Sequence, residues 1–131
     1  MGSVEYEEVL KSVRLIREGM PASVEEFKSM GLARDGVYKR LEFAIGVVLD
    51  GLSELAREHD IIALSYKEMV EGLSEKGVIP ESVADKAIFL AQLREVLIYD
   101  YDLVNDEMAF RDMGEYLEFI ETVLTFLEGS R

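Results

Sequence analysis

The stretch Val37-Tyr-Lys-Arg-Leu-Glu-Phe-Ala-Ile-Gly-Val-Val-Leu-Asp-Gly-Leu-Ser-Glu-Leu-Ala56 carries apolar residues at helical spacing over its whole length. They recur every three or four residues and form one stripe: Val37, Leu41, Ala44, Ile45, Val48, Leu49, Leu52, Leu55 and Ala56. We predict a helix from about Asp35 to His59, which would be roughly 37 Å long at helical rise. Because its apolar stripe is wide, a helix of this length indicates that further helices pack around it.

Helix start and stop signals divide the rest of the chain into further helices. They are an apolar pattern over residues 4–18, capping boxes at Ser23–Glu26 and Ser65–Glu68, a stop at Lys76-Gly77, Pro80 at a helix start, and Asn105 as the cap of a helix that Gly129 ends. No segment has the apolar–polar alternation of a half-buried strand. We therefore predict an all-α fold, an antiparallel bundle of about five helices that forms a single domain over residues 1–131.

Composition restricts the classes of function. The 131 residues include 27 acidic and 14 basic side chains, which give a net charge of −13, and no cysteine. A surface this acidic repels polyphosphate at long range, so general binding of RNA or DNA is disfavoured, although a few arginines can still form a local site. No apolar run approaches the ~20 residues that span a bilayer and no signal peptide opens the chain, so we expect a cytoplasmic protein without a membrane partner. The usual metal and nucleotide motifs are missing, which predicts no metal and no cofactor.

Several single residues have expected places in this bundle. Phenylalanines on the helical stripes are expected in the core: Phe27, Phe43, Phe89, Phe110, Phe119 and Phe126. Leu90, Leu93 and Leu97 share one side of their helix, and we expect this side to pair with a second copy of the chain. The single histidine, His59, ends the long helix, where a cation complements the helix dipole, so we expect a structural role for it.

The segment Arg94-Glu-Val-Leu-Ile-Tyr-Asp-Tyr101 carries most of the candidate chemistry. At 100° per residue, Tyr101 lies about 20° from Arg94 around the axis if the helix continues, and Tyr99 lies about 140° away. An arginine in such an apolar helix needs an acidic partner, or a site that faces solvent or another subunit. A structural ion pair with Asp100, Asp102 or a neighbouring helix is therefore an alternative to a functional role.

The order and spacing of several motifs resemble the HepT-like branch of the HEPN superfamily. Its signature is arginine, four residues, histidine, one residue and tyrosine, and Arg94 and Tyr101 match the first and last of these. The supporting matches are Ser23-Val-Glu-Glu-Phe27, Arg40-Leu-Glu-Phe-Ala-Ile45, Ser65-Tyr-Lys-Glu68 with Leu73, and Lys76-Gly-Val-Ile-Pro80. The resemblance covers about residues 4–128.

This resemblance implies a ribonuclease toxin that needs no metal, forms a homodimer around a shared cleft, and pairs with a minimal nucleotidyltransferase antitoxin. Arg94 would stabilise the charge on the phosphorane that forms when an RNA 2′-hydroxyl attacks the adjacent phosphate. Tyr101 would accept an adenylyl group from the nucleotidyltransferase, and Glu95 and Asp100 would be supporting residues of the motif.

Two residues depart from the family pattern where the chemistry takes place. Tyr99 stands at the position of the catalytic histidine, and Glu95 replaces the usual Asn or Asp. Histidine suits proton transfer because its pKa lies near neutrality, while tyrosine titrates near about 10. Three hypotheses follow: a ribonuclease toxin that uses Arg94 and Tyr99, a catalytically degenerate regulatory partner of the nucleotidyltransferase, and a helical interaction protein in which these residues are structural.

Overall fold

A computed structural model describes residues 2–130 of the chain, and the side chains of residues 5–130. The described residues form six α-helices and one short 3₁₀ helix: α1 (Gly2–Gly19), α2 (Val24–Ser29), α3 (Leu32–Glu58), α4 (Tyr66–Glu75), α5 (Glu81–Tyr99), η1 (Tyr101–Leu103) and α6 (Asp106–Gly129). Residues 2–130 contain no strand, which confirms the predicted all-α fold. Residues 1 and 131 of the predicted domain lie outside the described residues.

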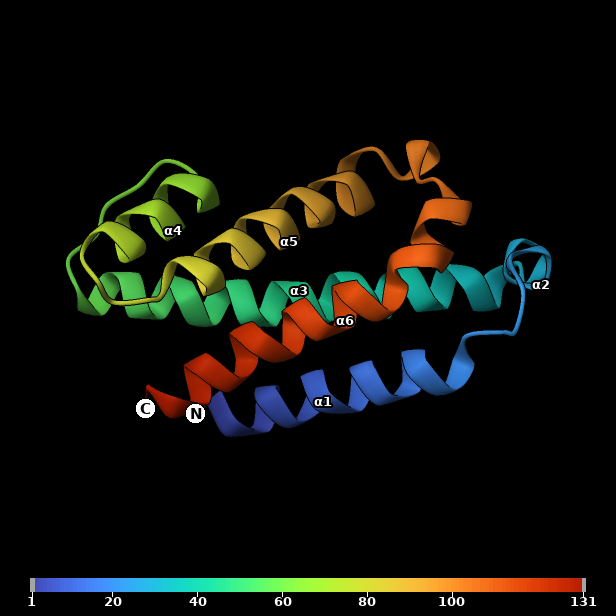
Figure 1. Cartoon of the computed structure of the whole chain (residues 1–131), viewed down its shortest axis with the longest axis horizontal. Coiled ribbons are helices and arrows are strands. Elements are labelled where there is room, and N and C mark those ends of the chain that lie inside the picture. The colour runs from blue at the N-terminus through green and yellow to red at the C-terminus, as the bar shows by residue number, and fades with distance from the viewer. Residues whose placement is uncertain (1, 131) are drawn as a thin grey trace.

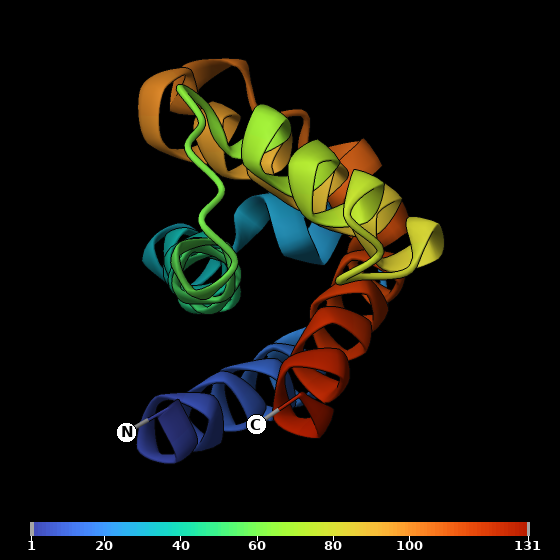
Figure 2. The same ribbon diagram turned by 90° about the vertical axis from the view of Figure 1, so that its left-hand side faces the viewer.

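The long helix α3 is the centre of the bundle. It packs against α1, α4, α5 and α6, and it runs antiparallel to α1 and α5 (Figure 1). Seen from the end of the bundle, α4 and α5 lie on one side of α3 and α1 lies on the other, while α6 packs against both α5 and α1 (Figure 2). Every residue of the predicted apolar stripe of α3 is buried, because neighbours cover this helix from several directions.

The predicted helix ends coincide with hydrogen-bonded caps. Ser23 Oγ accepts a hydrogen bond from the backbone N–H of Glu26 at 3.2 Å, and Ser65 Oγ accepts one from Glu68 at 3.1 Å. Asn105 Oδ1 accepts from the N–H of Met108 at 2.9 Å and starts α6. These bonds satisfy backbone donors that lack a partner in the first helical turn, so three helix starts predicted from the sequence are confirmed.

Some predictions about burial are wrong. Leu90 and Leu97 are buried inside the chain rather than free to pair with a second copy, because α5 is covered by α3, α4 and α6. Phe43 and Phe89 are exposed, while Phe27 is fully buried. Within residues 2–130, no helix combines the length and the apolar character that crossing a bilayer requires.

Candidate functional site

The candidate site lies where α5 ends and η1 begins. Asp100 leaves the helical conformation with φ −131° and ψ 38°, and its backbone N–H makes the last bond of the helix, to the carbonyl of Val96 at 3.0 Å. The carbonyl of Asp100 then accepts a bond from the N–H of Leu103 at 2.8 Å, which closes η1. The helix does not continue to Tyr101, because α5 stops at Tyr99, so the condition under which Tyr101 would lie about 20° from Arg94 around the axis is not met.

Arg94 lies against a glycine of α3. A Cβ atom added at Gly46 would be 3.3 Å from Arg94 Nε, so the absence of a side chain there makes room for the guanidinium group. Arg94 Nε is buried without a hydrogen-bond partner, and among residues 5–130 no carboxylate pairs with Arg94. The structural ion pair with Asp100 or Asp102 is therefore not formed.

Tyr99 is the last residue of α5 and lies largely in solvent. Its side chain is 77% exposed, and it makes no hydrogen bond to any residue between 5 and 130. The neighbouring Asp100 is also exposed and caps the helix through its backbone. The phenol of Tyr99 is thus free to meet a ligand or a second protein, but no group of the described chain holds it in place.

Tyr101 is held by α3. Its hydroxyl donates a hydrogen bond to Asp35 Oδ1 at 2.5 Å, and its ring packs edge-to-face against Tyr38 with 5.7 Å between the ring centroids. Partial burial, and then the hydrogen bond to Asp35, raise the pKa of Tyr101 to about 12. The side chain is still 38% exposed, so its hydroxyl is both hydrogen-bonded and near solvent.

A second tyrosine–aspartate pair lies beside the first, with a buried tyrosine and a partly buried aspartate. The Tyr38 hydroxyl donates to Asp106 Oδ1 at 2.6 Å, and Arg34 Nη1 donates to Asp106 Oδ2 at 3.0 Å. Burial is the largest cause that raises the pKa of Tyr38, and the bond to Asp106 raises it further. Because Tyr38 is only 3% exposed, this pair joins α3 to α6 as part of the core.

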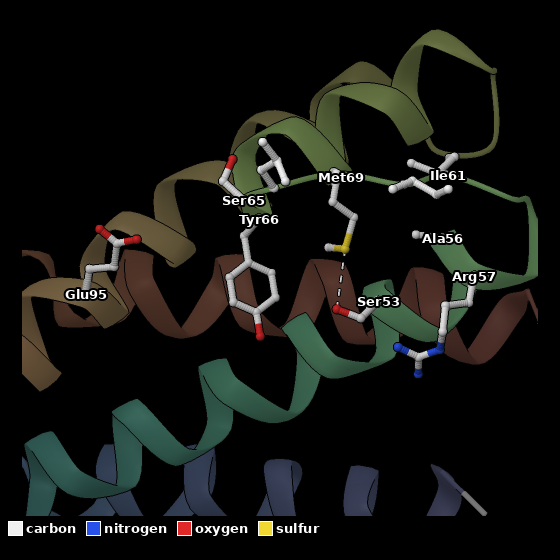
Figure 3. Close-up of a pocket in the computed structure, with 11 residues that line it drawn as sticks. Ser53, Ala56, Arg57, Ile61, Ser65, Tyr66, Met69 and Glu95 are labelled. Atoms are coloured by element: carbon white, nitrogen blue, oxygen red, sulfur yellow. Dashed lines mark hydrogen bonds between the residues drawn. The ribbon is translucent and has the colours of Figure 1, made fainter.

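Glu95 belongs to a separate groove between α3, α4 and α5. The groove has a volume of about 610 Å³ and is lined by Ser53, Ala56, Arg57, Ile61, Ile62, Ala63, Leu64, Ser65, Tyr66, Met69 and Glu95. Figure 3 shows Tyr66 and Met69 extending from α4 toward α3, where the Ser53 hydroxyl donates to Met69 Sδ at 3.3 Å. Glu95 therefore lines this groove, while Arg94 and Tyr101 do not.

His59 caps the C-terminus of α3, as predicted from its position. It lies more than three helical turns beyond Gly46, about 20 Å along the axis. His59 therefore cannot take the place of the missing histidine beside Arg94. No group of three or more His, Cys, Asp and Glu side chains within the described part of the chain is arranged to hold a metal ion.

The sequence did not identify three residues of this region as part of the site. Gly46 was a detectable case, because an isolated glycine within an apolar helix often marks a close approach. Asp35 and Tyr38 were not detectable as partners of η1, because their contacts to Tyr101 join residues more than 60 positions apart. Local patterns contain no information about which distant loop folds back onto the start of a helix.

Comparison with known protein families decides the classification. The family described as Ribonuclease HepT-like matches residues 7–126. The chain belongs to this family. A comparison with curated proteins gives no match.

Solved structures agree with this HepT-like classification at the level of the fold. A mutant of the MntA–HpeT toxin–antitoxin has a TM-score of 0.83 and 16% identity, with 95% of each chain covered. The tri-AMPylated HEPN toxin of Shewanella oneidensis, in complex with its MNT antitoxin, has a TM-score of 0.82 and 17% identity over 95% of this chain and 94% of that one. A toxin–antitoxin solved with AMP-PNP has a TM-score of 0.81 and 16% sequence identity, with 94% of each chain covered.

Proposed function

We propose that this HepT-like protein is the toxin-type component of a toxin–antitoxin pair, with RNA as its substrate class and a degenerate site that cleaves slowly. The observation that carries the proposal is the state of Arg94. The chain has 27 acidic residues, yet none of the described ones pairs with this guanidinium group. A cation left without a carboxylate is available to an external anion, and the phosphodiester of RNA is the anion that the family membership suggests.

Each motif residue has a role in this proposal. Arg94 stabilises the charge that develops on phosphorus as a 2′-hydroxyl attacks the adjacent phosphate. Tyr99 stands where the family has a histidine, and a phenol is a poor proton acceptor at neutral pH, so the step is slow. DNA is not a substrate because the attacking group is the 2′-hydroxyl, which only RNA carries.

A second copy of the chain completes the site. Val96, Leu103 and Met108 are exposed apolar residues that line one shallow cavity beside the end of α5, and exposed Tyr99 follows Val96 by one helical turn. An apolar patch of this kind marks a surface for another protein. We propose that this patch faces the second copy; it includes Leu93 and Leu97 of the predicted side but not the buried Leu90. A strictly monomeric protein at micromolar concentration in a sizing experiment would contradict the dimer.

The proposed partner is a minimal nucleotidyltransferase that transfers AMP to Tyr101. Support comes from the similar fold of the Shewanella oneidensis HEPN toxin, which is AMPylated and bound to its MNT antitoxin. Tyr101 is partly exposed and starts η1 just after the helix that carries Arg94, so an adenylyl group there would add bulk and negative charge near the proposed RNA site. We place the pair in the cytoplasm, where ATP and RNA are both present.

A second candidate function is a regulatory partner without nuclease activity. The replacement of the histidine by Tyr99 and the net charge of −13 favour it, because both oppose cleavage of a polyanion. RNA cleavage separates the two candidates. They make the same prediction for the nucleotidyltransferase and for Tyr101.

The test is an RNA-cleavage assay with wild type, Arg94→Ala and a matched control, Arg14→Ala. Both variants remove one arginine, but Arg14 is exposed on α1, which does not contact α5. We expect slow cleavage by wild type, a loss on the order of 100-fold in Arg94→Ala, and little change in the control. Equal rates in wild type and Arg94→Ala would remove Arg94 from the mechanism, and an inert wild type would favour the regulatory candidate.

A further inference from the structure

The hydrogen bond between Tyr101 and Asp35 joins a phenol, which can act as a nucleophile, to a carboxylate, which can accept its proton. The phenolic oxygen lies 2.5 Å from Asp35 Oδ1, a length typical of a strong O–H···O⁻ hydrogen bond. Neither partner is enclosed, since Tyr101 is partly exposed and 43% of the Asp35 side chain is accessible. A substrate from solvent can therefore approach Tyr101 while its O–H group stays hydrogen-bonded to the Asp35 carboxylate.

The two neighbouring tyrosines lack this combination. Tyr38 also donates to a carboxylate, but it is buried and out of reach of a second protein. Tyr99 is largely exposed, but no described group accepts its proton. Of the three, Tyr101 alone has both an exposed ring and a bound carboxylate within the described part of the chain.

We propose that Asp35 is the proton acceptor for adenylylation of Tyr101, so that this chain supplies the base for its own modification. The inference rests on the proposed function, because it needs the nucleotidyltransferase partner and ATP. Asp35 also fixes the direction of the phenol, since a hydrogen bond to Oδ1 and the edge-to-face contact with Tyr38 together restrain the ring.

The step balances as a nucleotidyl transfer. Tyr101 Oη attacks the α-phosphorus of ATP, and a new O–P bond forms. The bond from the α-phosphorus to the bridging oxygen breaks, and pyrophosphate leaves with the electron pair. The phenolic proton passes to the Asp35 carboxylate, so the attacking oxygen does not have to carry a positive charge.

The surroundings of Tyr101 disfavour its phenolate, so attack by its oxygen near neutral pH needs a base. Asp35 and Arg34 of α3 and Asp106 of α6 act on its hydroxyl, with Tyr38 packed beside it. Burial is the largest cause that raises the pKa of Tyr101, the hydrogen bond and the charge of Asp35 raise it further, and Asp106 adds to them, while Arg34 lowers it. The resulting pKa is about 12, so the phenolate is rare near neutral pH. Without a base, the rate would follow the small phenolate fraction and rise with pH.

The experiment measures adenylylation by mass spectrometry, with ATP, Mg²⁺ and a minimal nucleotidyltransferase from the same organism as the chain. Asp35→Asn keeps an oxygen that can accept the hydrogen bond but removes the basicity. Asp102→Asn is the matched control, because it removes the same charge one residue from Tyr101, while the Tyr101 hydroxyl is hydrogen-bonded to Asp35 and not to Asp102. Asp35→Glu restores a carboxylate, and thermal unfolding of each variant checks that the fold is kept.

We expect Asp35→Asn to lower the adenylylation rate on the order of 100-fold near pH 7, and we expect the remaining rate of this variant to rise steeply with pH. The rate of Asp102→Asn should stay within about twofold of the wild-type rate. Asp35→Glu should recover part of the rate. Equal rates in wild type and Asp35→Asn, equal losses in the two Asn variants, or modification at Tyr99 would overturn the role of Asp35 while leaving the partnership intact. An unmodified wild type would overturn the partnership, and the role of Asp35 with it.

Discussion

The two sides of α3 each depend on a glycine, but for different purposes. A Cβ at Gly51 would lie 2.8 Å from Leu127 Cδ1 and from Tyr6 Oη, so this glycine lets α6 and α1 approach the core. The three atoms nearest to a Cβ at Gly46 would all belong to the side chain of Arg94. The two glycines are five positions apart in the sequence, so at 100° per residue they lie about 140° apart around the helix axis. The same helix therefore supports the fold on one side and the candidate site on the other.

This difference implies that stability and function can be changed separately. The Gly51 side is made of aliphatic and aromatic side chains that cannot move without disturbing neighbours. On the Gly46 side lies a long, flexible arginine with a buried Nε and no ion pair among residues 5–130. A substitution at Gly46, against Arg94, should alter RNA cleavage, while a substitution at Gly51, against Leu127, should alter the free energy of unfolding.

Gly51→Ala should have the largest effect on stability. The added methyl group overlaps Leu127 and Tyr6, so we expect a loss of about 1–3 kcal/mol in the free energy of unfolding, measured by urea denaturation. Gly114→Ala on α6 is a suitable control, because a Cβ there meets nothing within 4 Å. Similar stabilities for the Gly51 and Gly114 variants would show that the close approach on this side is not required.

Gly46→Ala should leave stability within about 1 kcal/mol of wild type, because the gain in helix propensity offsets the displacement of one flexible side chain. The displaced guanidinium should lower RNA cleavage about tenfold, since misplacing a charged group weakens stabilisation of the transition state. The assay is best made in the Tyr99→His background, where faster cleavage makes a loss measurable. Unchanged cleavage would show that Arg94 does not need the space above Gly46.

The two tyrosine–aspartate pairs extend the comparison to alkaline pH. A folded-state pKa above the ordinary value of about 10 means that the neutral phenol is stabilised by folding. This stability is fully present below pH ~10 and, for Tyr101, is lost as pH rises through its pKa of about 12.

Tyr38→Phe and Tyr101→Phe should both flatten the loss of stability above pH ~10, measured as melting temperature against pH. The effect should be larger for Tyr38, because it is buried and its pKa is raised further. Equal slopes in the two variants would contradict the assignment of one pair to the core and the other to the surface.

The sequence predicted the fold better than the site. The apolar stripe of α3 and the capping residues Ser23, Ser65 and Asn105 are local signals, and the structure confirms each of them. The end of α5 depended on whether the helix continued past Asp100, and local spacing could not decide this. The contact of Tyr101 with Asp35 and the covering of α5 by three helices depend on how distant segments pack, which no periodicity contains.

The most direct test of the central claim is RNA cleavage by wild type and Tyr99→His, with Tyr99→Phe as a control. The claim is that this HepT-like chain keeps the fold and the arginine but lacks an efficient base. We expect Tyr99→His to cleave on the order of 100-fold faster than wild type, because an imidazole restores proton transfer near neutral pH, and Tyr99→Phe to show no gain. Wild-type cleavage equal to or faster than that of Tyr99→His would contradict the claim.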